Sequence, residues 1–447
     1  MTKYDKYVTA FQSLERSQAA REPQWVRDIR QRALSRFSEL GFPTARRGNE
    51  NWKYTNVGPV ANANFEYAFG ASRDGEKAIE LRGIAPWGQD WVNLVFLNGR
   101  YSEVLSTKPS SAYAARVTNL ADAFLRDGEV LEKHLARHAT FDDDGFTALN
   151  TSFLRDGAFI HIPEGESVQA PIHLIFIATG SDRPSASHPR TLIVTGKHSK
   201  ATIIESYIAL SPAPYFNNAV TEIVVGDQAQ IEHYRLLLDN TEAFHIGTSQ
   251  VYQGQDSKFT STIFAKGAAL GRNNIHVLLD APGSSCVLNG LYMTSGTQHM
   301  DNYINIDHAK PHAFSRLNYK GILDGKSRAV FGGIVVVRPG AIKTDARQSD
   351  KNLLLSRDAE VNSKPSLLIF ADDVKCGHGA TAGHIDGDSI FYMRSRGLDI
   401  DTASRLLIYG FAREIIDTVQ VEPLRVYLEK LFLGALPSFK LLFGERA

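Results

Sequence analysis

The chain has 447 residues, of which 43% are hydrophobic and 22% are charged, which is ordinary usage for a globular protein with a sizeable core. Its 49 basic and 49 acidic side chains balance, so the composition gives no support to a protein that coats nucleic acid or binds membranes through a polybasic surface. Two cysteines, Cys286 and Cys376, are too few for a disulfide scaffold or a four-cysteine metal site. No stretch approaches the ~20 apolar residues of a membrane span. The N-terminus lacks the apolar core of an export signal, and we expect a cytoplasmic protein.

Residues 1–157 are predicted to form an N-terminal helical and mixed region. Apolar residues recur at steps of three and four over residues 4–40, which is typical of amphipathic helices. Residues 91–104 predict a β-hairpin with an Asn-Gly turn. Two short helices are expected near residues 117–127 and 128–139.

Residues 158–400 have a different texture, in which short apolar runs rich in Val, Ile, Phe, Tyr and Thr alternate with compact polar bends. The bend glycines Gly196, Gly226, Gly254 and Gly283 follow one another at steps of 30, 28 and 29 residues. A repeat of this length made only of strands predicts a β-solenoid, in which each coil buries its inward side chains against the next. A large β-sandwich or barrel also alternates strands and turns, and it stays an alternative.

Residues 401–447 return to helical periodicity and are predicted to form a C-terminal helical region. The first stripe of apolar residues has steps of four: Ala403, Leu407, Phe411, Ile415 and Val419.

The segment 369–397 concentrates the side chains with the most chemical potential. If it is extended, Cys376 and His378 project from the same face of a strand. An imidazole beside a thiol can lower the pKa of the thiol and favour the thiolate, which ligates metal or attacks a sulfur donor. A bare Cys-x-His supplies only two ligands, and a free cysteine is often a small buried hydrophobe. If the pair holds a metal, the missing ligands must come from distant positions or from another chain.

Other features are weaker. Cys286, in a predicted strand, is expected to serve packing. A possible metal pair on a helix and a possible acid–base cluster are, respectively, His134 with His138, and Asp307 with His308 and His312. No GxxxxGK[ST] loop occurs, so we do not expect this chain to hydrolyse nucleotide.

Two motifs resemble a known family. DDVKCGHGATAGHID followed by IFYMRSRG resembles the C-terminal signature of the SufB/SufD family of iron–sulfur cluster assembly proteins, and ENWKYTNV (residues 50–57) resembles an N-terminal segment of that family. The Cys-x-His pair is similar to the SufD branch, whereas SufB typically has His-Glu at this place. Gly377 departs from the serine usual between the two ligands. The resemblance implies a right-handed parallel β-helix flanked by helical regions.

The resemblance also implies a non-catalytic scaffold subunit that pairs with the paralogue SufB and docks the ABC-type ATPase SufC. It places a nascent iron–sulfur cluster, or iron, transiently at Cys376 and His378, with SufB supplying the remaining ligands. It places SufC on the C-terminal helices, so Leu407, Phe411 and Ile415 have a partner-docking interpretation beside simple core packing. An open solenoid edge would also allow the isolated chain to form a homodimer.

Two functions of other classes stay open from the residues alone. One is a β-helix enzyme acting on polysaccharide, although such enzymes usually carry an export signal. The other is a transferase that uses Cys376 as nucleophile with His378 as its base.

Overall fold

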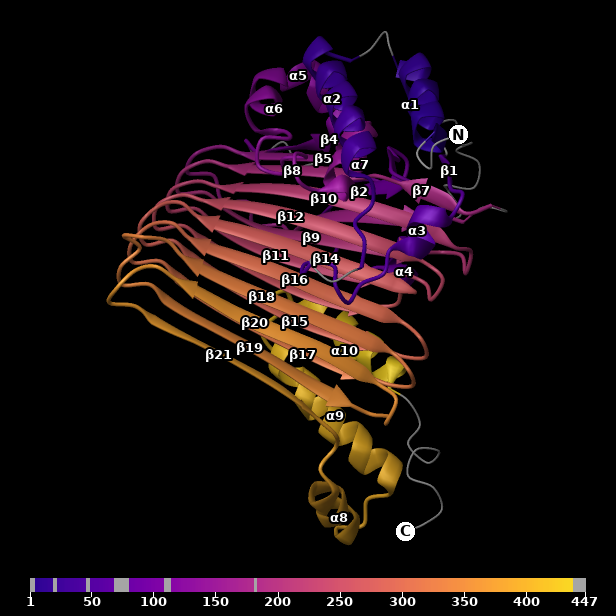
Figure 1. Ribbon diagram of the computed structural model, residues 1–447, viewed down its shortest axis with the longest axis vertical. Coiled ribbons are helices and arrows are strands. Elements are labelled where there is room, and N and C mark those ends of the chain that lie inside the picture. Colours follow the sequence, from indigo (N-terminus) through magenta and orange to yellow (C-terminus); the bar gives the residue numbers. More distant parts are fainter. Residues whose placement is uncertain are drawn as a thin grey trace.

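The computed structural model describes residues 5–18, 22–45, 49–67, 80–107, 114–180 and 183–436 (Figure 1). The helices in these ranges are α1 (Asp5–Gln18), α2 (Gln24–Leu40), α3 (Gly58–Asn62), α4 (Leu81–Ile84), α5 (Leu120–Arg126), α6 (Gly128–His134), α7 (Gly145–Ser152), α8 (Gly387–Ser395), α9 (Ile400–Ile416) and α10 (Glu422–Ala435). The strands of the first part are β1 (Glu66–Tyr67), β2 (Val92–Leu97), β3 (Arg100–Tyr101), β4 (Arg116–Asn119), β5 (Gly157–Ile162), β6 (Ile172–Ala178), β7 (Ser185–Ser187), β8 (Arg190–Thr195), β9 (Lys200–Ala209), β10 (Tyr215–Val225) and β11 (Gln230–Leu238). The remaining strands are β12 (Phe244–Gln253), β13 (Lys258–Lys266), β14 (Leu270–Leu279), β15 (Ser285–Thr294), β16 (His299–His308), β17 (Phe314–Leu323), β18 (Arg328–Val337), β19 (Asp345–Leu354), β20 (Glu360–Ile369) and β21 (Lys375–Gly383).

Successive strands alternate between two facing sheets. Sheet A has the order β20-β18-β16-β14-β12-β10-β8-β5-β4, and sheet B has the order β21-β19-β17-β15-β13-β11-β9-β6-β2-β3. From β5 and β6 onward, each strand pairs in parallel with the strand one coil later. This topology confirms the predicted parallel β-solenoid. The sandwich and barrel alternatives are wrong, because their neighbouring strands would run antiparallel.

Compact bends join the strands of sheet A to the next strands of sheet B, and those after β8, β10 and β12 have four residues each. In these three bends the third residue has a left-handed backbone, as at His198 (φ 60°) and Gln228 (φ 56°). A Cβ added to Gly226 would lie 2.6 Å from the carbonyl oxygen of Thr195 in the coil below. Close stacking of the coils therefore requires glycine at this point of the bend.

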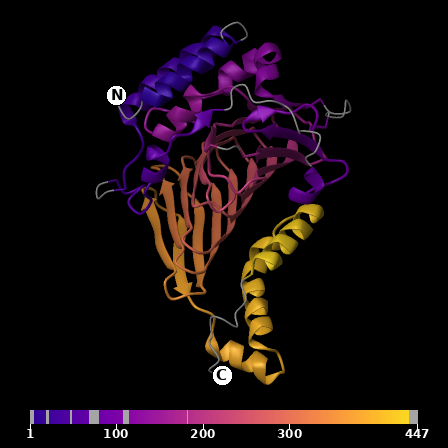
Figure 2. The same ribbon diagram turned by 90° about the vertical axis from the view of Figure 1, so that its right-hand side faces the viewer.

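The interior between the sheets is the main core. Its apolar side chains include Ile203, Ile231, Phe259, Ile275, Leu288, Ile304, Leu317, Phe331 and Val335. On the outside of sheet A, Phe146 of α7 packs with Phe216 of β10 and Phe37 of α2. On the outside of sheet B, α9 and α10 pack across successive strands from β17 to β9, and Figure 2 shows them running along the stack of coils. Helices thus cover the N-terminal part of sheet A and much of the outer face of sheet B, whereas no helix of the described ranges lies over the later strands of sheet A (Figure 1).

One charged cluster interrupts this apolar interior. Arg235 of β11 lies beside Glu205 of β9, with 3.3 Å between its Nε and Glu205 Oε2. Glu205 also accepts hydrogen bonds from the hydroxyls of Tyr207 (2.9 Å) and Thr221 (3.0 Å), and Arg235 donates to Ser249 Oγ (2.8 Å). Because Thr221 and Ser249 belong to sheet A, the cluster connects the two sheets across the interior.

The N-terminal motif forms a strap on the outside of sheet A. The Trp52 ring lies 3.8 Å from the guanidinium of Arg272, which is itself ion-paired with Asp301. Glu50 makes a 2.9 Å ion pair with Lys364 of β20. The strap therefore connects the N-terminal region to the last coil of the solenoid.

The predicted hairpin is confirmed, since β2 and β3 pair antiparallel with Leu97 opposite Arg100. Asn98 (φ 48°) and Gly99 (φ 78°) form the expected turn. The helix predicted from residue 117 begins only at Leu120, because residues 116–119 form β4, which pairs antiparallel with β5.

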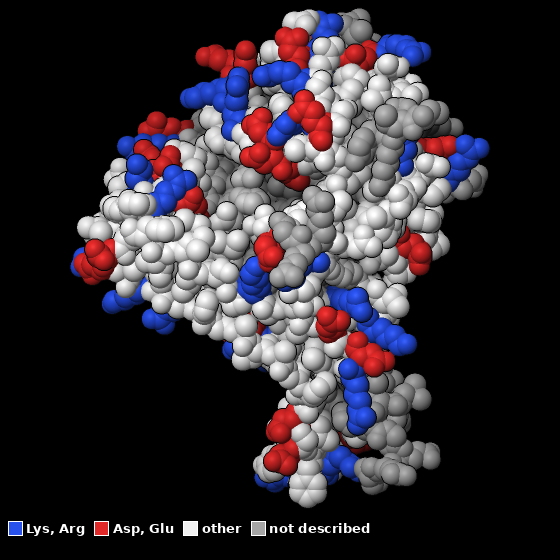
Figure 3. Space-filling model, viewed as in Figure 1, with Lys and Arg blue, Asp and Glu red and all other residues white. Residues whose placement is uncertain are grey.

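Charges of both signs are interspersed on the face shown in Figure 3, over the N-terminal helices and along the C-terminal helices, while the middle of that face is largely uncharged. In the described ranges, no helix has the length and hydropathy needed to cross a bilayer.

Candidate functional site

The last coil of the solenoid leaves both sheets with an unpaired edge, β20 in sheet A and β21 in sheet B. The amide of Lys375 donates to the carbonyl of Thr344, toward the preceding coil (2.8 Å). Since backbone groups alternate direction along a strand, the N–H and C=O groups of Cys376, His378 and Ala380 point to the free edge. The predicted site therefore lies on the open end of the solenoid.

Cys376 faces the interior of the solenoid at this end. It pairs with Ala346 in the coil below and lies in the same column of inward side chains as Cys286, three coils earlier. Cys286 is completely buried in the core, which confirms its predicted packing role. Cys376 is half-buried and packs against the edge of the same core. The thiol therefore lies at the open end of the solenoid interior and remains partly exposed.

Burial raises the pKa of the Cys376 thiol, the amide of Ala346 lowers it, and the nearby carboxylate of Asp345 raises it further. The sequence-based expectation that His378 lowers this pKa is therefore wrong for the isolated chain. The reason is that the thiol lies against apolar side chains and an acidic group, while the imidazole is exposed to solvent. A bound metal ion would stabilise the thiolate here.

His378 projects from the same side of β21 as Cys376 and pairs with Gln348 of β19. Within the described residues, no group of three or more His, Cys, Asp or Glu side chains is arranged to hold a metal ion. The two side chains alone offer one sulfur and one nitrogen ligand, fewer than a stable tetrahedral site requires.

The other edge strand, β20, ends in a small exposed apolar patch. Leu368, Ile369 and Phe370 are 47%, 41% and 62% exposed. The amides of Glu360 and Phe370 donate to the preceding coil, so the ring nitrogen of Pro365 lies on the free side of β20, where it removes one donor. The continuous hydrogen-bonding edge of the last coil is therefore β21.

Asp350 lies one coil below this end, paired with Ala380, and its side chain is 1% exposed. Its Oδ2 accepts hydrogen bonds from Ser363 (2.7 Å) and Asn352 (2.8 Å), while its Oδ1 has no partner in the described structure. Burial raises the pKa of Asp350 to about 6, although both hydrogen bonds lower it. A buried carboxyl without full hydrogen bonding was not foreseen from the sequence, because only the stacking of coils brings it here.

This carboxyl predicts a pH-dependent stability. The folded chain binds the proton more tightly than the unfolded chain, whose Asp titrates near about 3.9. Protonation of Asp350 therefore stabilises the fold. This contribution to the free energy of unfolding is complete below the unfolded value and is lost as the pH rises through about 6, and it amounts to about 3 kcal/mol. Asp350→Asn is therefore expected to be more stable than the wild type above neutrality and nearly equal at about pH 4, as measured by denaturant unfolding. The exposed Asp358→Asn serves as control, and parallel pH profiles for wild type and Asp350→Asn would contradict the assignment.

Two family models match this chain. One is described as the SufBD core domain of the SUF system for FeS cluster assembly and covers residues 176–411, and the other is the SufBD N-terminal region, over residues 1–174. The chain belongs to the SufBD family. It is thereby an iron–sulfur cluster assembly protein, and the resemblance drawn from the two motifs is confirmed.

Relatives in the SufBD family match over nearly the full chain. An iron–sulfur cluster assembly SufBD family protein of Synechocystis is 35% identical over 407 residues, which are 89% of this chain and 88% of that protein. The iron–sulfur cluster assembly protein SufD of Escherichia coli is 32% identical over 398 residues (88% and 89%). SufD of Bacillus subtilis is 24% identical over 420 residues (92% and 94%).

Other residues of the SufBD signature have structural contacts. Asp386 is the N-cap of α8 and accepts a hydrogen bond from the amide of Ser389 (3.0 Å). Asp373 pairs with Lys343 (2.5 Å), and His384 Nδ1 lies 2.8 Å from the carbonyl oxygen of Leu354. These contacts fix the chain as it leaves β21.

The predicted docking residues of the SufBD chain differ in burial. Ile415 is 2% exposed and packs against sheet B. Phe411 and Leu407 are half-buried, and the ammonium of Lys320 lies 4.5 Å from the Phe411 ring centroid and donates to the Phe411 carbonyl (2.8 Å). The large apolar side chains that these helices expose most are Phe391, Tyr392, Leu406, Leu433 and Val426.

The weaker candidate clusters belong to no group of three or more metal-ligating side chains within the described ranges. His134 and His138 contact each other, with 3.3 Å between their ring nitrogens, and burial lowers the pKa of His134 to about 4. The predicted grouping of Asp307 with His308 is wrong, because neighbouring residues of a strand face opposite ways, and His312 lies in the bend between β16 and β17. Asp307 faces outward and pairs with Arg338 (2.6 Å), whereas His308 is buried inside.

Proposed function

We propose that this chain is the SufD-type scaffold subunit of an iron–sulfur assembly complex. The observation that carries the proposal is the position of Cys376 and His378 on the same side of β21, an edge strand that pairs with β19 and has one free edge at the open end of the solenoid. Two ligands held at an unpaired edge suit a site that a second chain completes. The SufB-type paralogue would supply the remaining ligands. It would also cover the exposed apolar patch formed by Leu368, Ile369 and Phe370.

The cargo of this site would be iron and sulfide. The thiol of Cys376 would lose its proton on binding iron, and the neutral imidazole of His378 would bind through a ring nitrogen. The two would hold the nascent cluster transiently, with no resident cofactor in this chain, and the chain itself would catalyse no reaction. The raised pKa of Cys376 disfavours the transferase alternative, which needs a preformed thiolate.

The SufC-type ATPase would dock on the C-terminal helices in the cytoplasm. Phe391 and Tyr392 of α8 are 74% and 59% exposed, which suits a surface covered by a partner. Ile415 packs internally and would transmit movement of α9 to sheet B. When no paralogue is available, the same open edge would allow two copies of this chain to pair.

Complementation tests the site. In a strain that depends on this system, Cys376→Ala and His378→Ala are each expected to lower the activity of iron–sulfur enzymes by about tenfold or more, because each removes a ligand. Cys286→Ala is the matched control, since it removes the thiol of the same interior column three coils away from the edge. Unimpaired activity in both site variants would refute the assignment.

A further inference from the structure

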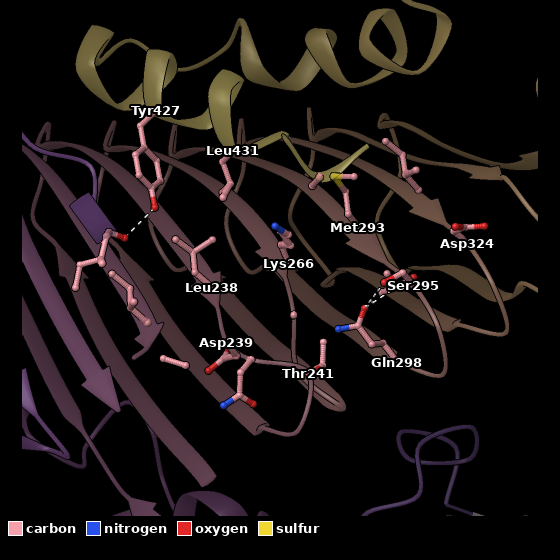
Figure 4. A pocket seen from close by; sticks show the side chains of 18 of the residues that line it. Leu238, Asp239, Thr241, Lys266, Met293, Ser295, Gln298, Asp324, Tyr427 and Leu431 are labelled. Carbon is pink, nitrogen blue, oxygen red and sulfur yellow. Dashed lines mark hydrogen bonds between the residues drawn. The ribbon is translucent and has the colours of Figure 1, made fainter. Parts of the chain in front are cut away.

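A cavity of about 470 Å³ lies between the outer face of sheet B and α10, at the side of the solenoid away from the strap (Figure 4). Its floor includes Leu238 at the end of β11 and Met293 near the end of β15, and Tyr427 and Leu431 project from α10. One end is closed where the hydroxyl of Tyr427 donates to the carbonyl of Ile84 (3.0 Å). Pockets for small ligands typically have about 300–1,000 Å³, so this one is of sufficient size.

Lys266 places an unpaired cation in this cavity. It is the last residue of β13 and lies between Leu238 and Met293 in the close view of the site (Figure 4). Its ammonium has neither a hydrogen bond nor an ion pair to any residue in the described ranges. The Lys266 side chain is exposed, borders the apolar side chains of Leu238 and Met293, and has no ion-pair partner among the described residues, so its ammonium is available to an anionic group.

The acidic side chains of the cavity already have partners. The carboxylate of Asp239 accepts a hydrogen bond from the hydroxyl of Tyr215, and its Oδ2 lies 3.2 Å from Nδ1 of His245. One carboxylate oxygen of Asp324 accepts a hydrogen bond from the amide of Gly325 (2.8 Å). Asp324 lies beyond Met293 in the view of Figure 4. Neither of them makes an ion pair with Lys266.

A second donor and an apolar extension complete the cavity. The side-chain oxygen of Gln298 accepts the amide of Ser295 (2.8 Å), and its NH₂ group donates to no described residue. A smaller apolar hollow shares Leu238, Lys266, Met293 and Leu431 with the cavity and continues beneath α10. Its further lining residues are Phe264, Ala265, Leu291, Ile416, Leu428 and Phe432.

We propose that this cavity binds a small amphipathic organic anion, with its acidic group on Lys266 and its apolar body between sheet B and α10. Such a ligand would contact the solenoid and the C-terminal helices together, and it would hold α10 against sheet B. The consequence for ATPase docking rests on the proposed function, whereas the binding itself does not.

The test uses the purified full-length chain and the fluorescent anion 8-anilinonaphthalene-1-sulfonate, whose emission rises in an apolar site. Lys266→Met keeps the apolar stem and removes the charge, and it is expected to raise the dissociation constant about tenfold. Lys266→Arg is expected to stay within about threefold of the wild type, because it keeps the charge. The matched control is Lys258→Met at the other end of β13, because this lysine is exposed like Lys266 but does not line the cavity.

A second variant separates this site from other apolar surface that the dye might touch. Leu431→Trp fills the cavity from α10 without changing charge. In the wild type, the fatty acid anion decanoate should compete with the dye for the cavity and displace part of its fluorescence. Leu431→Trp is expected to abolish this displaceable part of the dye signal. Its fold is checked by thermal unfolding, and the lysine variants carry the test if it does not fold. Equal dye affinity of the wild type and Lys266→Met, or an equal loss in Lys258→Met, would overturn the proposal. Because no partner chain or cluster is present, either outcome is independent of the proposed assembly function.

Discussion

Replacing Ala380 with proline is expected to abolish the proposed pairing of this chain with a SufB-type paralogue while the chain itself stays folded. The N–H of Ala380 points to the free edge of β21, so proline removes no hydrogen bond from the ladder between β21 and β19. The preceding residue is Gly379, which tolerates the backbone restriction that proline imposes. A partner strand added along β21 would lose a donor and meet the pyrrolidine ring.

Co-purification with the tagged partner measures this effect, and the recovered partner is expected to fall about tenfold or more. Ala380→Ser is the matched control, because it keeps the N–H and the small side chain and should pair normally. The thermal unfolding of Ala380→Pro should stay close to that of the wild type. Normal recovery of the partner by Ala380→Pro would show that β21 is not the paired edge.

The second large effect is expected in the interior charged cluster. Arg235→Met should destabilise the fold by about 3–5 kcal/mol, because it leaves the carboxylate of Glu205 buried without its cation. Burial alone would raise the pKa of Glu205, and the charge of Arg235 together with the hydrogen bonds from His233 and Tyr207 holds that pKa well below the ordinary value. The stabilisation is therefore present above the pKa of the unfolded chain and is lost as the pH falls through the folded value.

Denaturant unfolding at neutral pH measures the loss. The double variant Glu205→Gln/Arg235→Met carries no buried charge and is expected to recover much of the stability lost by Arg235→Met alone. A loss below about 1 kcal/mol in Arg235→Met would mean that water or rearrangement satisfies Glu205.

The sequence predicted those features that repeat or that depend on local geometry. Bend glycines such as Gly226 report coil stacking directly, because a side chain there would touch the coil below. The two-residue spacing of Cys376 and His378 fixed their common face once the segment was extended. The family motifs linked this pair of residues to iron–sulfur cluster assembly.

Features that depend on register between coils could not be predicted in this way. Asp350 meets Ser363 and the open end only through the stacking of β19 with β21 and the closure of the two sheets. The pKa of Cys376 follows from the core it touches, which the local sequence does not show. Likewise, a stripe at steps of four could not reveal that Ile415 turns to sheet B while Leu406 is exposed.

The measurement that tests the central claim most directly is the iron and acid-labile sulfide content of the complex co-purified with its partners. The wild-type complex is expected to carry both, and the Cys376→Ala complex should assemble normally yet lose most of them, since the alanine changes no backbone group of β21. A Cys376→Ala complex with wild-type iron and sulfide would contradict the claim that a thiol and an imidazole on the last coil hold the nascent cluster.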